Sequence, residues 1–369
     1  MKGNIAGDAE GKSVYLYAEN AAAPLDSAVI RNGAFTLAGK IEHPRLLTIK
    51  IVKTEGRAPQ PIIPLFMDNE KVEVTTVLDS LPLQYLVREY PYHNVSVKGS
   101  ALHDAYVAYK LEFEKINKQR DARFDDYIAY LNPGAGKEKA PVSEGIELVT
   151  RVDLESENIK AYVARFVREN AGNAIGLHAL QSNLSRFTAS EIDDLLSSIP
   201  PAARESAAGQ TLLARADEVK LTAIGAPFID FLLRDQDGNP VKLSDHVAKG
   251  RHVLLEFWAS WCGPCRADIP HLKEVYELYH PEGFDVVSIS MDSDEKAWKQ
   301  AIHDEQMSWL QVSDLRAFEG DIAKKYNFSG IPFCVLLSPD GVIINRNMRG
   351  SWMDKNLITL YGNKFGKKY

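Results

Sequence analysis

The sequence is short of cysteine, of positive charge and of long apolar stretches. Only three cysteines occur among 369 residues, which excludes the disulfide framework that holds many small secreted domains together. The formal net charge of -7 gives no reason to expect nucleic acid or an anionic membrane surface as a partner. No apolar run approaches the roughly 20 residues that span a bilayer. With 45% hydrophobic and 25% charged residues, the chain is expected to fold into two or three globular domains.

The first segment, residues 1–98, has the short alternating apolar runs that are typical of β-strands. Asn32-Gly33 predicts a hairpin, because both residue types accept the positive φ values of a type I′ turn. We therefore expect an antiparallel β domain, either a sandwich or a barrel. Its expected strands are 14–17, 28–30, 34–37, 46–51, 62–66 and 72–75.

The second segment, residues 99–220, changes to a helical period. Apolar residues between Ile159 and Val167 recur at the spacing of one helix face, and 132–136 (Asn-Pro-Gly-Ala-Gly) interrupts the segment. Thr188 with Glu191 three residues later predicts a capping box at a helix start. The aromatic stripes of this helical segment are expected to pack between helices.

The third segment, residues 221–369, alternates strand and helix patterns, which predicts a central, partly parallel sheet covered by helices. A hairpin is expected from strands 228–233 and 241–243. The other expected strands are 253–258, 284–290, 333–337 and 342–345, and the expected helices are 265–279, 295–305 and 320–326.

Two of the three cysteines, Cys262 and Cys265, stand at C-x-x-C spacing between a strand and a helix. Such a pair can open and close as a disulfide. At the first turn of a helix, the unpaired N–H groups and the helix dipole favour the thiolate of Cys262. Gly263 would allow a tight turn, and Pro264 suits the first helical turn. Cys265 could then attack a mixed disulfide at Cys262 and release the reduced partner.

The alternative reading of these cysteines is a metal site or an unreactive pair. A closed zinc site needs four ligands, and the sequence has neither a second C-x-x-C nor an H-x-x-x-H motif. We therefore expect no metal, and no cofactor beyond the disulfide itself. Cys334 stands alone in an apolar strand and is expected to be a buried, inert thiol, with a resolving or regulatory role as the alternative.

The run 258–265, Trp-Ala-Ser-Trp-Cys-Gly-Pro-Cys, resembles the active site of the thioredoxin superfamily. Together with the preceding hairpin, the run 265–272 and Gly330-Ile331-Pro332, it is similar to the TlpA/ResA-type thiol-disulfide oxidoreductases over about residues 221–369. The resemblance implies a thioredoxin-like α/β domain, preceded here by the antiparallel β domain and the helical segment. Residues 1–220 resemble the accessory region of longer TlpA-like lipoproteins.

Glu256 lies in the apolar run 253–258, where a buried carboxylate is costly unless it is used. It matches the buried acid of the family, so the resemblance implies a raised pKa and a proton relay to and from Cys265. The alternative is a glutamate at the strand end that leans into solvent.

Pro332 matches the cis-proline that faces the dithiol in the family. The resemblance implies that the backbone of Ile331 pairs with an extended segment of the substrate. Trp258 is expected to pack in the core or at the rim, and Trp261 to contact a partner. The implied substrate-binding residues are Trp261, Gly263, Pro264, Ile331 and Pro332.

The favoured function is a thiol-disulfide oxidoreductase that reduces protein disulfides, with an upstream electron donor. A thiol peroxidase of peroxiredoxin type is an alternative, although a peroxidatic cysteine usually follows a threonine three residues earlier, where this chain has Ala259. A third hypothesis makes residues 1–220 a partner-binding or homodimerisation module.

The expected location rests on the resemblance, which implies the periplasm or another extracytoplasmic part of a bacterial envelope. The first residues lack the apolar core of a signal peptide, so a lipid anchor would require a missing leader. Composition alone permits the cytosol.

Overall fold

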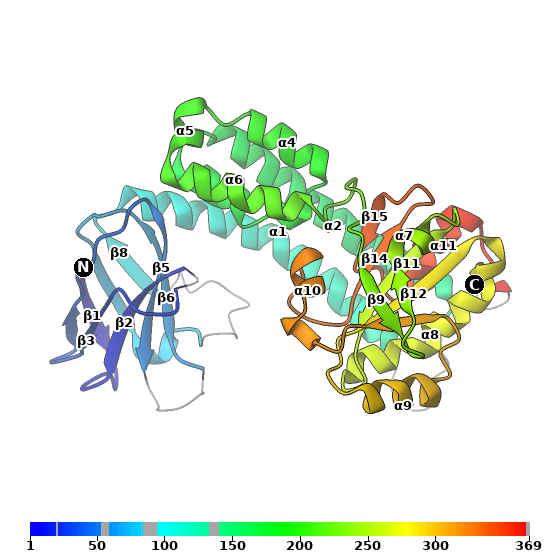
Figure 1. The fold of residues 1–369 in the computed structure, drawn as a ribbon. Helices are drawn as coiled ribbons and strands as arrows, with labels where there is room; N and C mark the ends of the chain where they lie inside the picture. The colour runs from blue at the N-terminus through cyan, green and yellow to red at the C-terminus, as the bar shows by residue number, and fades with distance from the viewer. Residues whose placement is uncertain (20, 53–58, 84–93, 133–139, 367–369) are drawn as a thin grey trace. The chain divides into compact units, whose positions relative to one another are not determined.

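The computed structural model describes residues 1–19, 21–52, 59–83, 94–132 and 140–366. The chain divides into two compact units (Figure 1). One unit comprises residues 1–119, 155–183 and 195–214, and the other comprises residues 120–154, 184–194 and 215–369. The two units share the long helices of the middle segment, and the three-domain division at residues 98 and 220 stays a prediction.

The N-terminal strands form two four-stranded sheets, in the orders β4-β1-β7-β8 and β3-β2-β5-β6. Inward-facing side chains of both sheets share one core, which includes Ile5, Val14 and Ile49. Of the two predicted forms, a sandwich or a barrel, the structure has the sandwich. The strands are β1 (Lys2–Ala6), β2 (Ser13–Ala18), β3 (Asp26–Val29), β4 (Ala34–Thr36), β5 (Arg45–Val52), β6 (Ile62–Met67), β7 (Glu73–Val77) and β8 (Val95–Lys98).

Two features of this sandwich differ from the prediction. Strand β1 pairs with β7 in parallel, although a purely antiparallel domain was expected. Sequence analysis missed β1, because Gly3 supplies no apolar side chain: a Cβ there would run into the ring of Phe35 on the neighbouring strand. Asn32-Gly33 does form the predicted turn, with φ values of 52° and 71°. The strands on either side of that turn then enter different sheets.

The helices of the middle segment are α1 (Ala101–Leu131), α2 (Val142–Glu169), α3 (Ala174–Gln181), α4 (Ala189–Ser197), α5 (Pro201–Glu205) and α6 (Ala207–Lys220). The capping box is confirmed: the Thr188 N–H donates to Glu191 Oε2 at 2.8 Å, and the Glu191 N–H donates to Thr188 Oγ1 at 3.3 Å. Helix α1 ends at Leu131, directly before the predicted break at 132–136. Residues 133–136 of that break lie outside the described residues. Tyr109 and Phe166, with ring centroids 4.4 Å apart, confirm aromatic packing between α1 and α2.

A seven-stranded sheet forms the core of the C-terminal domain, in the order β10-β9-β13-β12-β11-β14-β15. The central strands β11, β12 and β13 are parallel, and the remaining pairs are antiparallel. This mixed sheet is the one predicted. Its strands are β9 (Leu232–Asp235), β10 (Pro240–Lys242), β11 (His252–Trp258), β12 (Phe284–Ser290), β13 (Leu310–Ser313), β14 (Phe333–Leu337) and β15 (Ile343–Arg346).

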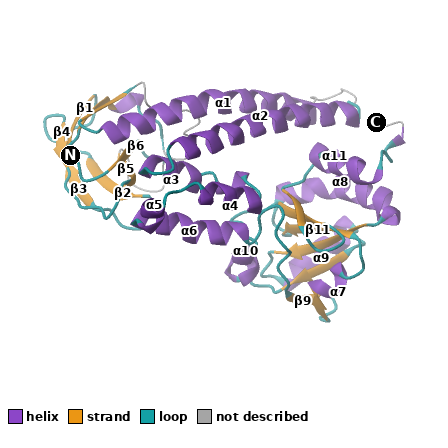
Figure 2. Cartoon of the chain, turned by 90° about the horizontal axis from the view of Figure 1, so that it is seen from above, coloured by secondary structure: helices purple, strands orange, loops and turns teal. Residues whose placement is uncertain are grey.

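The helices of this domain are α7 (Leu243–Val247), α8 (Gly263–Tyr279), α9 (Glu295–Glu305), α10 (Asp321–Lys325) and α11 (Ser351–Tyr361). Helices α8 and α11 lie side by side (Figure 2). Strand β13 and helices α7 and α11 were not expected. The predicted strand at 228–233 is wrong over residues 228–231, because the Phe228 N–H donates to the Gly341 carbonyl at 2.8 Å and holds this stretch on the turn between β14 and β15.

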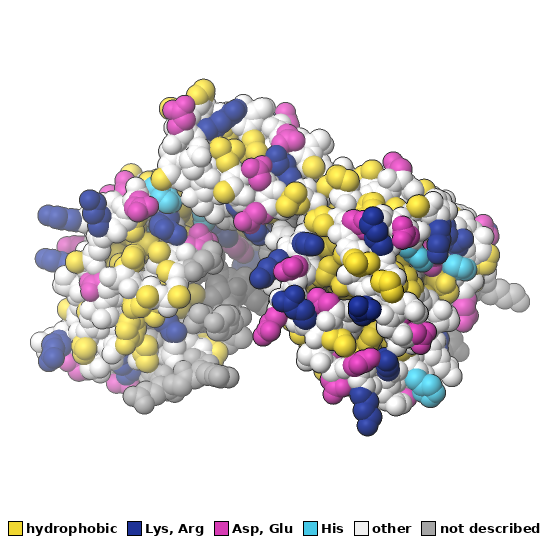
Figure 3. All heavy atoms as spheres, viewed as in Figure 1, with side chains coloured by type: hydrophobic (Ala, Val, Ile, Leu, Met, Phe, Trp, Pro, Cys, Tyr) yellow, Lys and Arg dark blue, Asp and Glu magenta, His cyan; other side chains and the backbone are white. Residues whose placement is uncertain are grey.

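Charged side chains of both signs are interspersed on the face drawn in Figure 3. Within the described parts of the chain, no helix combines the length and the hydropathy that a membrane span requires. The long helices α1 and α2 carry charged residues along their whole length.

Candidate active site

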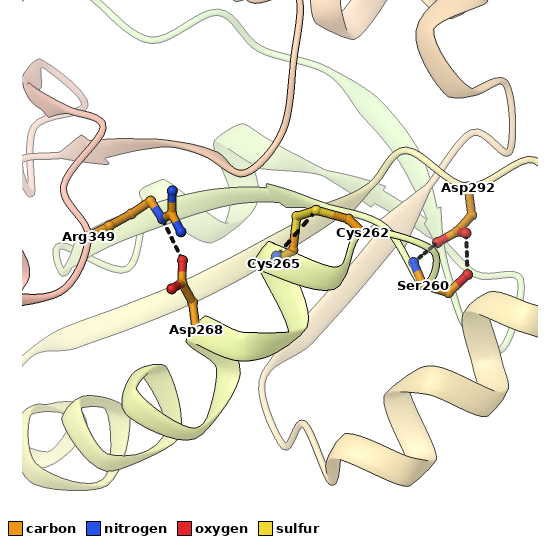
Figure 4. The surroundings of a disulfide bond; sticks show 6 residues. All are labelled: Ser260, Cys262, Cys265, Asp268, Asp292 and Arg349. Atoms are coloured by element: carbon orange, nitrogen blue, oxygen red, sulfur yellow. Dashed lines mark hydrogen bonds and ion pairs between the residues drawn. A yellow bond between two sulfur atoms is a disulfide. The ribbon is translucent and has the colours of Figure 1, made fainter. Parts of the chain in front are cut away.

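The dithiol lies where β11 passes into α8, as the sequence predicts. Cys262 is the N-cap residue of α8 and forms a disulfide with Cys265, with 5.3 Å between the two Cα atoms. The backbone N–H of Cys265 also points at Cys262 Sγ, at 3.2 Å (Figure 4). A negative charge on Cys262 would therefore be met by a backbone donor and by the positive end of the helix.

A buried carboxylate fixes the residues just before the dithiol. Asp292, which follows β12, is 1% exposed and accepts hydrogen bonds from the Ser260 N–H at 2.9 Å and the Ser260 hydroxyl at 2.6 Å (Figure 4). The Ser290 hydroxyl donates to the same carboxylate at 2.7 Å. These bonds tie the turn to the carboxyl end of β12, the strand parallel to β11.

Glu256 is inside the domain, in the middle of β11, and is 9% exposed. Its carboxylate accepts a hydrogen bond from the Ser288 hydroxyl at 2.5 Å, and Ser288 in turn accepts from Trp309 Nε1 at 2.7 Å. Burial raises the pKa of Glu256 to about 8, and the Ser288 bond offsets only part of that effect. The predicted burial and raised pKa are confirmed, and the solvent-facing alternative is wrong.

A small cavity brings Glu256 and Cys265 together. Its volume is about 20 Å³, and its lining includes Cys334 and the ion pair of Asp268 with Arg349. Figure 4 shows this ion pair on the far side of the dithiol from Asp292. The cavity has room for about one water molecule.

Pro332 also lines this cavity, and the Ile331–Pro332 peptide bond is cis, as predicted. Trp261, immediately before Cys262, is 60% exposed, so its indole is free to meet a partner. Trp258 is fully buried and donates from Nε1 to Gln311 Oε1 at 3.2 Å, which assigns it to the core.

Comparison with known proteins agrees with this geometry. Residues 223–353 match the redoxin family, and residues 1–106 match a domain of unknown function, DUF4369. The chain is 33% identical to a thiol-disulfide oxidoreductase of Bacteroides fragilis with a solved structure, covering 36% of this chain and 98% of that one, with a TM-score of 0.35. The C-terminal domain belongs to the TlpA/ResA-like thiol-disulfide oxidoreductases of the thioredoxin superfamily.

Curated relatives of the TlpA/ResA-like domain include the thiol-disulfide oxidoreductase ResA of two bacteria. The identity is 30% for the Oceanobacillus iheyensis protein, over 34% of this chain and 66% of the relative. It is 29% for the Bacillus thuringiensis protein, over 33% of this chain and 67% of the relative. The chain thus spans about two thirds of the length of these relatives, while the matches cover about a third of this chain.

Cys334 of the TlpA/ResA-like domain lies opposite Glu256 on the adjacent strand β14. It is 2% exposed and donates from Sγ to the Met348 carbonyl at 3.2 Å. Burial raises the pKa of this thiol to about 12, which keeps it protonated. Its predicted burial is confirmed.

One expectation about the dithiol turn is wrong. Gly263 is expected to allow a tight turn. In the structure it is the first residue of α8, and a Cβ there would meet nothing within 4 Å. Backbone sterics therefore do not demand glycine at this position. Pro264 does occupy the first helical turn, as predicted.

Sequence reasoning missed Asp292, Asp268 and Arg349. Asp292 could have been found from its place at the carboxyl end of a buried parallel strand, next to the end of β11, where ligand and active-site groups of α/β sheets gather. Arg349 and Asp268 are 81 positions apart in the sequence, and no local pattern links them. Within the described residues, no cluster of three or more His, Cys, Asp or Glu side chains is placed to hold a metal ion.

Proposed function

We propose that the protein reduces protein disulfides by dithiol exchange through Cys262 and Cys265. The Cys262 thiolate attacks one sulfur of the substrate disulfide, and the other substrate sulfur leaves as a thiolate. Cys265 then attacks Cys262 Sγ, which releases the second substrate thiolate and closes the Cys262–Cys265 disulfide. Two electrons pass to the substrate, and an upstream dithiol donor restores the reduced pair.

The observation that carries this proposal is the placing of Cys262 as the N-cap of α8, with Glu256 and Cys265 lining one cavity behind it. Cys265 must lose a proton before it attacks. A carboxylate whose pKa is about 8 can take that proton at little cost, because a free thiol has a pKa of about 8.5. One water molecule in the cavity would suffice as a bridge between the two groups.

The substrate, the location of the protein and the role of residues 1–220 are part of the proposed function. The substrate would be a protein disulfide held at Trp261 and beside Ile331-Pro332, and no cofactor other than the disulfide is required. The resemblance to TlpA/ResA-like proteins supports an extracytoplasmic location, with a lipid anchor supplied by a leader. Residues 1–220 would select the partner or form a homodimer.

Insulin-disulfide reduction with a dithiol donor tests the proposal. We expect Cys262→Ser to fall to the rate of the donor alone, while Cys334→Ala keeps the wild-type rate because its thiol is buried and protonated. We also expect Cys265→Ser to accumulate the mixed disulfide. Unchanged activity in Cys262→Ser would show that the proposed nucleophile is wrong.

A further inference from the structure

A large groove lies beside the dithiol cavity, within the compact unit that holds the C-terminal domain. Its volume is about 880 Å³, which falls in the range of about 300–1,000 Å³ that is usual for ligand pockets. The end of α1 and the start of α2 form one wall, and α8 together with the start of α11 forms the other. Of the residues proposed above to react or to hold the substrate, Pro332 also lines this groove.

Specific bonds hold the α1–α2 wall against α11. The Tyr127 hydroxyl accepts from the Ser351 N–H at 3.0 Å. Asp153 accepts from Trp352 Nε1 at 2.8 Å and from Lys355 Nζ at 2.7 Å. The wall is therefore anchored at both helices of the pair.

Two glycines permit this close approach. A Cβ on Gly350, where φ is +51°, would lie 2.5 Å from the Tyr127 hydroxyl oxygen. A Cβ on Gly145 would lie 2.7 Å from the ring of Tyr130. Any larger residue at either position would push the end of α1 and the start of α2 away from α11. Glycine at both positions therefore preserves the shape of the groove.

The groove adjoins the dithiol cavity. Five residues line both spaces: Asp268, His271, Pro332, Arg349 and Gly350. A molecule that lies in the groove therefore extends to the proline beside which the substrate chain is proposed to pass. A segment of the substrate itself is the occupant that this adjacency favours, because attachment at Cys262 raises its effective concentration in the groove.

The lining of the groove is mainly aromatic and aliphatic. The rings come from both walls, and Trp352 meets Tyr127 edge-on at 5.0 Å between centroids. Ile128 remains 39% exposed on the α1 side. Two pairs of charged groups of the lining bind each other, Asp268 with Arg349 and His271 with Asp354 at 2.8 Å, and Glu274 adds a further carboxylate. The apolar lining residues are Phe124, Tyr127, Ile128, Tyr130, Leu131, Val142, Trp352 and Phe365.

We propose that this groove binds the stretch of substrate polypeptide next to its reactive cysteine and prefers an aromatic or large aliphatic side chain there. This inference rests on the proposed disulfide reduction for its biological meaning. Apolar side chains gain by leaving water for such a lining. A carboxylate on the substrate would be desolvated in the groove without a free cationic partner among the charged pairs named above.

Two peptide disulfides that differ in one residue beside the cysteine, Phe or Asp, provide the test. For wild type, we expect the Phe peptide to have a KM about tenfold lower than the Asp peptide, with similar kcat. Ile128→Glu should abolish this preference. Leu154→Glu is the matched control, since Leu154 is 63% exposed on α2 outside the groove, and it should keep the preference.

Binding of the same peptides with Ser in place of Cys, followed by calorimetry, separates this proposal from the redox function. A Phe preference in binding that Ile128→Glu removes supports the groove even if no disulfide is reduced. Equal binding of the two peptides, or equal effects of Ile128→Glu and Leu154→Glu, overturns it. Tight binding of dodecanoate without any peptide preference would overturn it too and would assign the groove to a small apolar ligand.

Discussion

Two buried carboxylates flank the dithiol turn, and they are held in different ways. Asp292, on the Ser260 side, accepts from a backbone N–H and two hydroxyls. Glu256, on the Cys265 side, accepts from one hydroxyl among the described residues, that of Ser288, and lines a cavity. A well-bonded carboxylate is stable as a charge inside a protein, whereas a poorly bonded one favours its protonated form.

The difference teaches that burial alone does not give a carboxylate a chemical role. The hydrogen bonds of Asp292 give it a structural role, because they hold the turn in place. Burial raises the pKa of Glu256 to about 8, and the hydrogen bond from Ser288 offsets only part of that effect, so a proton can be given and taken near physiological pH. The following predictions test this distinction.

The largest expected effect is on the pH dependence of folding stability. Between its ordinary pKa near 4.5 and about 8, Glu256 keeps its proton in the folded protein and loses it in the unfolded chain. The folded state then binds more protons, so this contribution to stability is complete below pH 4.5 and is lost as pH rises through 8. Relative to Glu256→Gln, wild type should lose about 4 kcal/mol between pH 4.5 and 9.

Urea unfolding of both proteins, in the disulfide form, measures this difference. The Gln variant keeps the size and hydrogen-bonding capacity of the protonated acid, so it is the matched control. Parallel stability curves for the two proteins would show that Glu256 is as well stabilised in its charged form as in water.

The next effect is on the resolving step. In Glu256→Gln, attack of Cys265 on the mixed disulfide should slow about 100-fold at pH 7, because a general base is lost. In wild type, the same step should accelerate as pH rises and level off above about 8, once the carboxylate is ionised. Stopped-flow release of a labelled peptide thiol measures this rate. An equally fast step in Glu256→Gln would remove Glu256 from the mechanism.

A smaller effect is expected on the other side of the turn. Asp292→Ala leaves the half-buried Ser260 N–H without its acceptor and should cost about 2 kcal/mol of folding stability. The cost should be present at pH 5 in urea unfolding, where Glu256→Gln should cost under about 1 kcal/mol because it replaces an acid that is already protonated. Equal losses of folding stability for the two substitutions at pH 5 would contradict the distinction between a structural role for Asp292 and a proton-transfer role for Glu256.

The smallest effect is expected at the exposed rim. Trp261 is 60% exposed, so Trp261→Ala should change the free energy of unfolding by less than about 0.5 kcal/mol. The KM of the Trp261→Ala variant for insulin should nevertheless rise, while its KM for a small aromatic disulfide stays unchanged. Only a protein substrate is large enough to contact the exposed indole while its disulfide is at Cys262. Steady-state kinetics with both substrates measures this split. Equal KM values for insulin would assign Trp261 no part in binding.

Much of the fold was accessible from local pattern. The period-2 runs of residues 1–98, the capping box at Thr188 and the alternation of strand and helix after residue 221 each depend on neighbours within a few positions, and the structure agrees with them. The direction of the β1–β7 pairing and the short strand β13 were out of reach. Alternation of side chains reports which face is buried, but it carries no information on which strand lies alongside.

The same division applies to the site. The sequence by itself determined the dithiol at a strand-to-helix turn and a glutamate inside an apolar strand, because both are set by residues close together in the chain. Tertiary structure alone decided that Asp292 binds Ser260, 32 positions away in the sequence. It also decided that the end of α1 and the start of α2 form one wall of a groove that Pro332 lines. It also left Glu256 with Ser288 as its one hydrogen-bond donor within the described parts of the chain. These features depend on which distant segments meet, and folding fixes that through the packing of the whole domain.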